Sequence, residues 1–204
     1  MEIFAGSKKL VENFREIKIR QKDSAIKRTA LVTLGASLIR VFEKKTKEDL
    51  LEVLGSVPIA DLRKINSESK FETFYKLQLN RIERAVLKRN AKNKKLGKGL
   101  KWGHCTKVLS IFLREIVLRS RIFPDTRVDQ LKPFLYAPLD SKVLRRLRKC
   151  GLAKVPHKIN KLKTARQFWE LQESIRKAAK EAGTFAIYLD DVWVEDTDQN
   201  ASNG

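Results

Sequence analysis

The fold is decided by two stretches of sequence, KGLKWGHCTKVLSIFLREIVL at residues 98–118 and FLYAPLDSKVLRRL at residues 134–147. The first begins with glycines and lysines and continues into an apolar run, which predicts a buried helix over 106–120. The second places Asp140 directly before a segment with helical periodicity, as an N-cap residue would be. A helix is therefore predicted over 141–150, and Gly151 is expected to end it.

Helical periodicity extends over most of the remaining chain, so the sequence predicts an all-α protein. The other helices expected from the spacing of apolar residues lie at 8–22, 25–42, 46–54, 59–65, 69–90, 128–135 and 165–182. Residues 185–194 fit a short strand or an extended packing segment, and the acidic, polar residues 195–204 fit a disordered tail. We expect one globular unit over 1–194, which could divide into two helical lobes at 24–87 and 98–194 with a cleft between them.

The charge of the chain is its most unusual property. Its 204 residues include 44 Lys and Arg against 24 Asp and Glu, a formal net charge of +20. A compact body with such an excess repels itself, so the excess normally faces a polyanion. Nucleic acid is the commonest polyanion, and phosphate contacts by Lys and Arg supply most of its non-specific affinity. We expect DNA, in double-stranded form, as the partner.

Two basic tracts contain no compensating acid. Residues 88–101 hold seven Lys or Arg with two glycines and are predicted to form a basic loop, and residues 141–169 hold ten. A charge run is usually a solvated face, but an uncompensated run in a strongly basic chain more often meets phosphate. The expected DNA-contacting residues are Lys98, Lys101, Gly103, His104, Lys142, Arg145 and Arg146.

Several other classes of protein do not fit the sequence. No run of about 18 apolar residues suggests a membrane span, and the N-terminal residues lack the pattern of a secretory signal. Cys105 and Cys150 give no disulfide framework, and their spacing from His104 and His157 fits no zinc pattern. We therefore expect a cytoplasmic, monomeric protein without metal or cofactor.

The order of parts in these stretches resembles the helix-hairpin-helix superfamily of DNA glycosylases. In that superfamily, a glycine-containing hairpin holds a DNA phosphate, a buried helix follows, and a catalytic aspartate begins a later helix. WGHCTKVLSIFL at 102–113 is similar to the helix after the hairpin, with Gly103 at the second hairpin glycine. APLDSKVLRRL at 137–147 is similar to the aspartate phrase and places Asp140 at the catalytic position. FWELQESIRKAAKEAG at 168–183 is a third landmark.

The chain also departs from the superfamily pattern. Lys101 stands at the first hairpin glycine and Leu100 at the usual proline. Cys105 occupies the place of the nucleophilic lysine of bifunctional members, so the resemblance implies a monofunctional enzyme. Lys107, two positions further on, is a second catalytic candidate, and its alternative is a solvated residue on the polar side of a helix.

The chemistry of N-glycosidic bond cleavage explains why one catalytic carboxylate is enough. Breaking an N-glycosidic bond builds positive charge on the sugar, which an ionised aspartate stabilises while it orients the attacking water. The base must leave the stack for a pocket with aromatic faces, for which Trp102, Phe134 and Tyr136 are candidates together with His104. The alternative is that Asp140 only caps its helix, and both roles are compatible. Phe168 and Trp169 are expected in the core.

The phrases quoted above resemble, within the superfamily, a set of small prokaryotic and phage-related proteins. That set includes phage enzymes that hypermodify bases and an anti-phage glycosylase acting on glucosylated hydroxymethylcytosine. The resemblance implies hydrolytic excision of a modified base, with α-glucosyl-hydroxymethylcytosine in phage DNA as the expected substrate and antiviral defence as the role. The alternatives are a repair glycosylase for damaged bases, an enzyme that remodels thymine derivatives, and a non-catalytic DNA- or RNA-binding protein.

Overall fold

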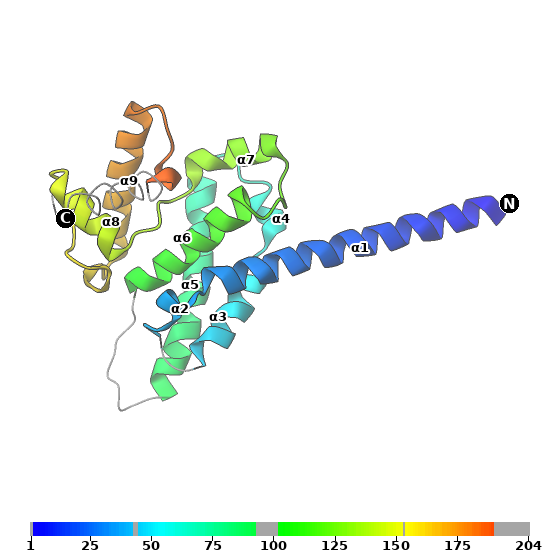
Figure 1. The fold of residues 1–204 in the computed structure, drawn as a ribbon, viewed down its shortest axis with the longest axis horizontal. Helices are drawn as coiled ribbons and strands as arrows, with labels where there is room; N and C mark the ends of the chain where they lie inside the picture. The colour runs from blue at the N-terminus through cyan, green and yellow to red at the C-terminus, as the bar shows by residue number, and fades with distance from the viewer. Residues whose placement is uncertain (1, 43–44, 93–101, 153, 190–204) are drawn as a thin grey trace, which may run out of the picture.

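The computed structural model describes residues 2–42, 45–92, 102–152 and 154–189, and every regular element within them is helical (Figure 1). The α-helices are α1 (Glu2–Thr33), α2 (Ala36–Ile39), α3 (Thr46–Gly55), α4 (Ile59–Leu62), α5 (Glu68–Lys92), α6 (Trp102–Leu118), α7 (Asp125–Leu131), α8 (Ser141–Lys149) and α9 (Ala165–Glu181). Short 3-10 turns follow at η1 (Lys132–Phe134), η2 (Ile159–Lys161) and η3 (Ala186–Tyr188). The prediction of an all-α protein is confirmed for this part of the chain.

Helix α1 is longer than the sequence predicts. The sequence predicts a boundary at Asp23 or Ser24, either of which could cap the helix expected over 25–42, but the helix runs through both residues to Thr33. Both side chains are exposed, so water can satisfy them, and intrinsic propensity is a weak guide where tertiary contacts hold a helix. The prediction of separate helices at 8–22 and 25–42 is therefore wrong. The first half of α1 extends away from the other helices (Figure 1), whereas the second half packs on them.

A contiguous core joins the described helices from α1 to η3. Helix α6 is its central element and contacts both α1 and α5, while α3 packs on α1 and α5. Val108, Phe112 and Ile116 of α6 are fully buried, in agreement with the buried helix predicted over 106–120. Burial of such side chains is the main source of stability in a helical protein.

Aromatic rings fasten α9 to this core. The cluster consists of Tyr75, Tyr136, Phe168 and Trp169, whose neighbouring ring centroids lie 4.8–5.8 Å apart. The hydroxyl of Tyr75 donates to the carbonyl oxygen of Thr106, 3.0 Å away. Phe168 is fully buried and Trp169 is partly buried against the core, as the sequence predicts.

The segment that leads to α8 is fixed by one amide side chain. Gln172 of α9 donates to the carbonyl oxygen of Ala137 (2.8 Å) and accepts from its N–H (2.9 Å). At the other end of α8, Gly151 has φ +82°, a left-handed conformation that glycine adopts without strain. The predicted start and end of this helix are thus both confirmed.

Other segments predicted from the sequence lie only partly within the described residues. Helix α5 continues to Lys92, so the start of the predicted basic loop is helical, and the remainder of 88–101 lies outside the described residues. Ala186–Tyr188 is a 3-10 turn rather than a strand. The predicted tail at 195–204 also lies outside the described residues. No helix in the described part of the chain is both long and apolar enough to cross a bilayer.

Candidate active site

Asp140 is the N-cap of α8. Its backbone is extended, and its Oδ1 accepts hydrogen bonds from the N–H groups of Lys142 and Val143, each at 2.8 Å. These two N–H groups have no partner within the helix, so the carboxylate satisfies donors that would otherwise need water. The predicted capping role is confirmed, and the same contacts fix the direction of the carboxylate.

Lys107 contacts the other oxygen of the same carboxylate. Its Nζ lies 3.2 Å from Oδ2 of Asp140, although 33 residues separate them. The two side chains are 24% and 26% exposed, so the pair is half-buried. The structure thus brings together the two residues that the sequence predicts as catalytic candidates, and Lys107 is not the ordinary solvated residue of the alternative interpretation.

The surroundings of Asp140 keep it ionised. Burial alone would raise its pKa, but the hydrogen bonds from Val143 and Lys142 and the ammonium of Lys107 outweigh burial and lower the pKa below its usual value. At neutral pH the cavity therefore contains a carboxylate anion. A negative charge held at a helix N-terminus is also favoured by the helix dipole.

The pair borders a surface cavity of about 220 Å³. Helix α6 contributes His104 and Lys107 to its wall, and the start of α8 contributes Asp140, Ser141 and Lys142. The apolar part of the wall consists of Leu38, Val41 and Ile159. Larger hollows, such as one of about 600 Å³, occur elsewhere on the described surface, and some of them hold paired carboxylates, such as Glu72 with Lys76. The cavity at Asp140 differs from that hollow because both members of its pair line the wall, and their side chains are only 26% and 24% exposed. It is the best candidate for a reaction centre.

Sequence reasoning missed the apolar wall of this cavity. Leu38 and Ile159 are apolar residues with no feature that separates them from core residues, and they lie far from Asp140 in the sequence. No signal in the sequence could have identified them. Ser141 could have been suspected because it adjoins Asp140, and its Oγ accepts from the N–H of Ile159 at 3.2 Å.

Gly103 allows α6 to touch the segment around η2. A Cβ at this position would lie 2.4 Å from the carbonyl oxygen of Ile159, so only glycine fits without a shift. The N–H of Gly103 donates to the carbonyl oxygen of Leu162 at 3.1 Å. The sequence predicts that Gly103 contacts DNA as a hairpin glycine. Its N–H is instead bonded within the protein, so it does not hold a DNA phosphate. Lys98 and Lys101 of the predicted hairpin lie outside the described residues.

The aromatic residues expected to contact a flipped base lie elsewhere. Tyr136 is only 3% exposed and belongs to the aromatic cluster. Burial raises its pKa to about 12, against the opposing effect of Arg176. Trp102 packs edge-on against Phe168 at 5.7 Å, and Phe134 is partly buried against the core. None of the three lines the cavity at Asp140. The reason is physical: large rings gain more from burial than from a polar cavity wall.

His104 does line the cavity. It is buried, and its ring meets that of Phe42 edge-on at 6.3 Å. The ring therefore has one side against the protein and contributes to the cavity wall beside Lys107. Of the expected base contacts, it is the residue that the structure places beside Asp140.

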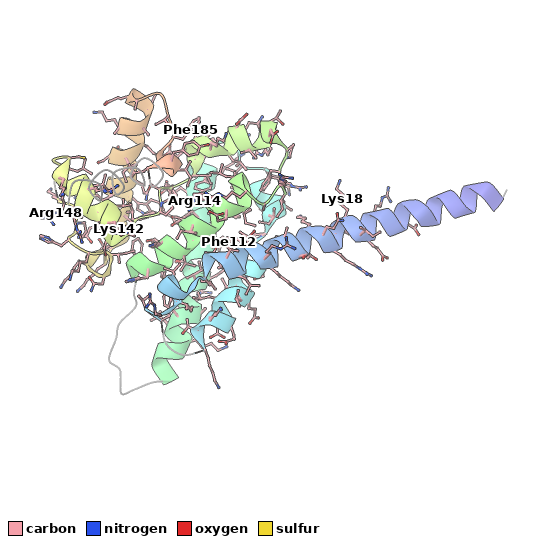
Figure 2. The ribbon with its side chains drawn as sticks, viewed as in Figure 1. Lys18, Phe112, Arg114, Lys142, Arg148 and Phe185 are labelled. Atoms are coloured by element: carbon pink, nitrogen blue, oxygen red, sulfur yellow. The ribbon has the colours of Figure 1, made fainter. Side chains whose placement is uncertain are left out.

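A basic stripe lies on α8 next to the cavity. Lys142, Arg145, Arg146 and Lys149 are spaced i, i+3, i+4 and i+7, which places them on one face of the helix. Val143, Leu144 and Leu147 occupy the buried face. All stripe residues are exposed except Arg146, which is half-buried. Figure 2 shows Lys142 at the start of α8 with Arg148 beyond it, on the side of the molecule away from the projecting half of α1.

Comparisons with protein-family models, with curated proteins and with solved structures find no match for this chain. Among the residues that the structure describes, no group of three His, Cys, Asp or Glu side chains is placed to share a metal ion.

Proposed function

We propose that this chain is a DNA glycosylase that binds duplex DNA through the basic stripe of α8 and uses Asp140 as its catalytic carboxylate. The observation that carries the proposal is the half-buried ion pair between Asp140 and Lys107 at the mouth of a cavity beside that stripe. Half-buried charged groups with a lowered pKa in a cavity are typical of functional sites. The resemblance of the motifs to helix-hairpin-helix glycosylases supports the same assignment.

In the proposed reaction, water attacks C1′ of the deoxyribose as the bond from C1′ to the base nitrogen breaks. The electron pair of that bond leaves with the base, which takes up a proton, and an abasic site remains. Positive charge develops on the sugar in the transition state. Oδ1 of Asp140 is held by backbone N–H groups, so Oδ2 is the oxygen that we assign to the sugar and to the proton of the attacking water.

Lys107 is proposed as a positioning residue. Its ammonium holds Oδ2 in place and favours the ionised carboxylate. An ammonium in an ion pair has no free electron pair with which to attack C1′, which supports hydrolysis over a Schiff-base mechanism. Borohydride reduction should therefore trap no covalent complex with an abasic duplex, and a trapped complex that Lys107→Met loses would show that Lys107 is a nucleophile instead.

The proposed substrate is a modified base, with α-glucosyl-hydroxymethylcytosine in phage DNA as the first candidate and a damaged base as the second. Pockets that enclose drug-sized ligands measure about 300–1000 Å³, and the cavity at Asp140 is smaller. We therefore place only the sugar ring and the near edge of the base in it. A glucosyl group would remain on the open side, towards solvent.

The test compares base release by the wild type and by Asp140→Asn on glucosylated and on unmodified duplexes. Asparagine is also a good N-cap, so the variant should fold while losing the charge. We expect Asp140→Asn to produce at least about 100-fold fewer alkali-labile sites than the wild type. Mass spectrometry identifies the bases that the wild type releases. Asp125→Asn, at an exposed aspartate on α7, is the matched control and should keep full activity. Equal activity of Asp140→Asn and the control would refute the proposal.

The second candidate is a DNA- or RNA-binding protein without catalysis. It is favoured by the engagement of both carboxylate oxygens of Asp140 within the protein and by the burial of Tyr136, which removes an expected base contact. In that case, wild type and Asp140→Asn would bind duplex DNA equally and neither would release a base.

A further inference from the structure

A basic groove runs between α1 and the end of α6, at the other end of α6 from Asp140. It consists of two adjoining hollows of about 190 and about 600 Å³. Ala25 and Ser120 line both hollows, so the two are continuous. None of the residues predicted from the sequence to contact DNA lies in this groove, and it has no part in the proposed reaction.

The wall of the groove is far more basic than the chain as a whole. The larger hollow contributes five basic residues and the smaller one two, so seven of the fifteen distinct lining residues are Lys or Arg, against 44 of 204 in the whole chain. These residues are Arg15, Lys18, Lys22, Arg63, Arg121, Arg28 and Arg119. The groove is therefore a local concentration of positive charge.

The one acidic residue of this wall is already neutralised. Glu115 is 11% exposed and lies 3.3 Å from Nε of Arg114 and 3.4 Å from Nη1 of Arg119. In contrast, Arg15, Lys18 and Lys22 take part in no ion pair within the described part of the chain. Their charge is available to a partner.

The floor of the groove is held in place before any partner binds. Oγ of Ser120 donates to the carbonyl oxygen of Ile116 (2.5 Å) and accepts from the N–H of Ile122 (3.3 Å). Arg63 donates to the carbonyl oxygen of Ile122 at 3.1 Å, and its guanidinium lies 5.7 Å from the ring centroid of Phe123. A fixed floor lowers the entropy lost when a ligand binds.

The free cations of α1 form a straight row. Arg15, Lys18 and Lys22 are spaced i, i+3 and i+7 and so lie on one face of the helix over roughly 10 Å. A straight row of point charges matches a linear polyanion, in which negative charges repeat at short intervals along an axis. Figure 2 shows Lys18 on the projecting half of α1, well apart from Lys142 on α8.

We infer that this groove binds the phosphodiester backbone of duplex DNA, as a contact surface separate from the cavity at Asp140. The inference rests on the proposed function only in taking DNA as the partner. It adds a second contact surface, built from α1 and the α6–α7 connection, to the stripe on α8.

The test uses the variant Arg15→Ala/Lys18→Ala/Lys22→Ala and an unmodified duplex of 24 base pairs. Alanine is the best helix former, so α1 should remain intact, which circular dichroism checks. The matched control removes the same charge from exposed lysines elsewhere, as Lys47→Ala/Lys70→Ala/Lys177→Ala. The dissociation constant of each protein is measured between 50 and 200 mM salt.

Each phosphate contact contributes about 0.9 to the slope of log K against log salt concentration. The α1 variant should therefore lose about 2 to 3 in slope, whereas the control should lose less than about 1. Equal slopes for the two variants, with tight binding by the wild type, would overturn this inference alone. Failure of the wild type to bind the duplex would overturn the proposed function, and the inference with it.

Discussion

Tyr136 and Asp140 lie four residues apart in one segment and have different environments. Tyr136 is only 3% exposed among the rings of the aromatic cluster and lines another hollow together with Trp169. The side chain of Asp140 is 26% exposed and borders the cavity that it shares with Lys107. Gln172 clamps the backbone between them at Ala137. The difference shows that an aromatic residue near a candidate catalytic group in sequence is not evidence of a base-binding pocket. The cost of leaving a large ring in water decides its position first.

The largest effect is expected from the loss of one ring of the aromatic cluster that surrounds Tyr136. Phe168→Ala should lower the free energy of unfolding by about 3–5 kcal/mol, because it removes a fully buried ring from the cluster. Phe185→Ala, at a ring that is 37% exposed and labelled in Figure 2, is the control and should cost less than about 1 kcal/mol. Urea denaturation measures both. Similar losses for the two variants would mean that the cluster is not part of the core.

A smaller effect is expected where α6 meets the cavity wall. Gly103→Ala should cost about 1–3 kcal/mol, because the new Cβ would meet the carbonyl oxygen of Ile159. Gly55→Ala is the control, since nothing lies within 4 Å of its Cβ position, and it should be neutral or stabilising by up to about 1 kcal/mol. The two variants are compared by urea denaturation at pH 7. A neutral Gly103→Ala would contradict the close approach of α6 to η2.

The cap of α8 gives a third and smaller effect. Asp140→Ala should lower the free energy of unfolding by about 1 kcal/mol, whereas Asp140→Asn should cost only a few tenths, since asparagine also caps. Thermal or urea unfolding of the two variants side by side provides the measurement. Identical losses would show that the charge of Asp140, and not its hydrogen bonds to Lys142 and Val143, stabilises the helix.

The smallest effect is the pH dependence of the stability difference between the wild type and Asp140→Asn. The pKa of Asp140 is lower in the folded protein than in the unfolded chain, so its ionised form stabilises the fold at pH values above about 3.9. As the pH falls below this value towards the folded-state pKa, that contribution is lost. The gap in unfolding free energy between wild type and Asp140→Asn should be constant from pH 5 to 7 and should narrow below about pH 4. A gap that widens in acid would contradict the lowered pKa.

Local features of the fold could be predicted from the sequence. Asp140 as N-cap and Gly151 as C-terminal stop were both identified, because each depends on a few neighbouring residues. The boundary expected at Asp23 failed for the opposite reason, since the packing of the second half of α1 against α6 is a tertiary effect. Intrinsic capping preference was too weak to oppose it.

The sequence predicts the polar residues of the candidate site but not the contacts between them. Lys107 and Asp140 could each be selected by residue type and motif, but their contact spans 33 residues and no pattern in the sequence shows it. The contact of Gly103 with Ile159 is equally long-range. The direction in which Tyr136 points depends on helices α5 and α9, which lie far away in the chain.

The distribution of charge along α1 also bears on where the protein first meets its partner. A helix of 32 residues is roughly 48 Å long, and eight basic against four acidic residues give α1 a net charge of +4. The three basic and three acidic residues before Lys18 balance, so the whole excess lies between Lys18 and Thr33. At physiological salt, charges are screened beyond about 8 Å, so a diffusing polyanion is attracted where α1 joins the main body and not along its projecting tip.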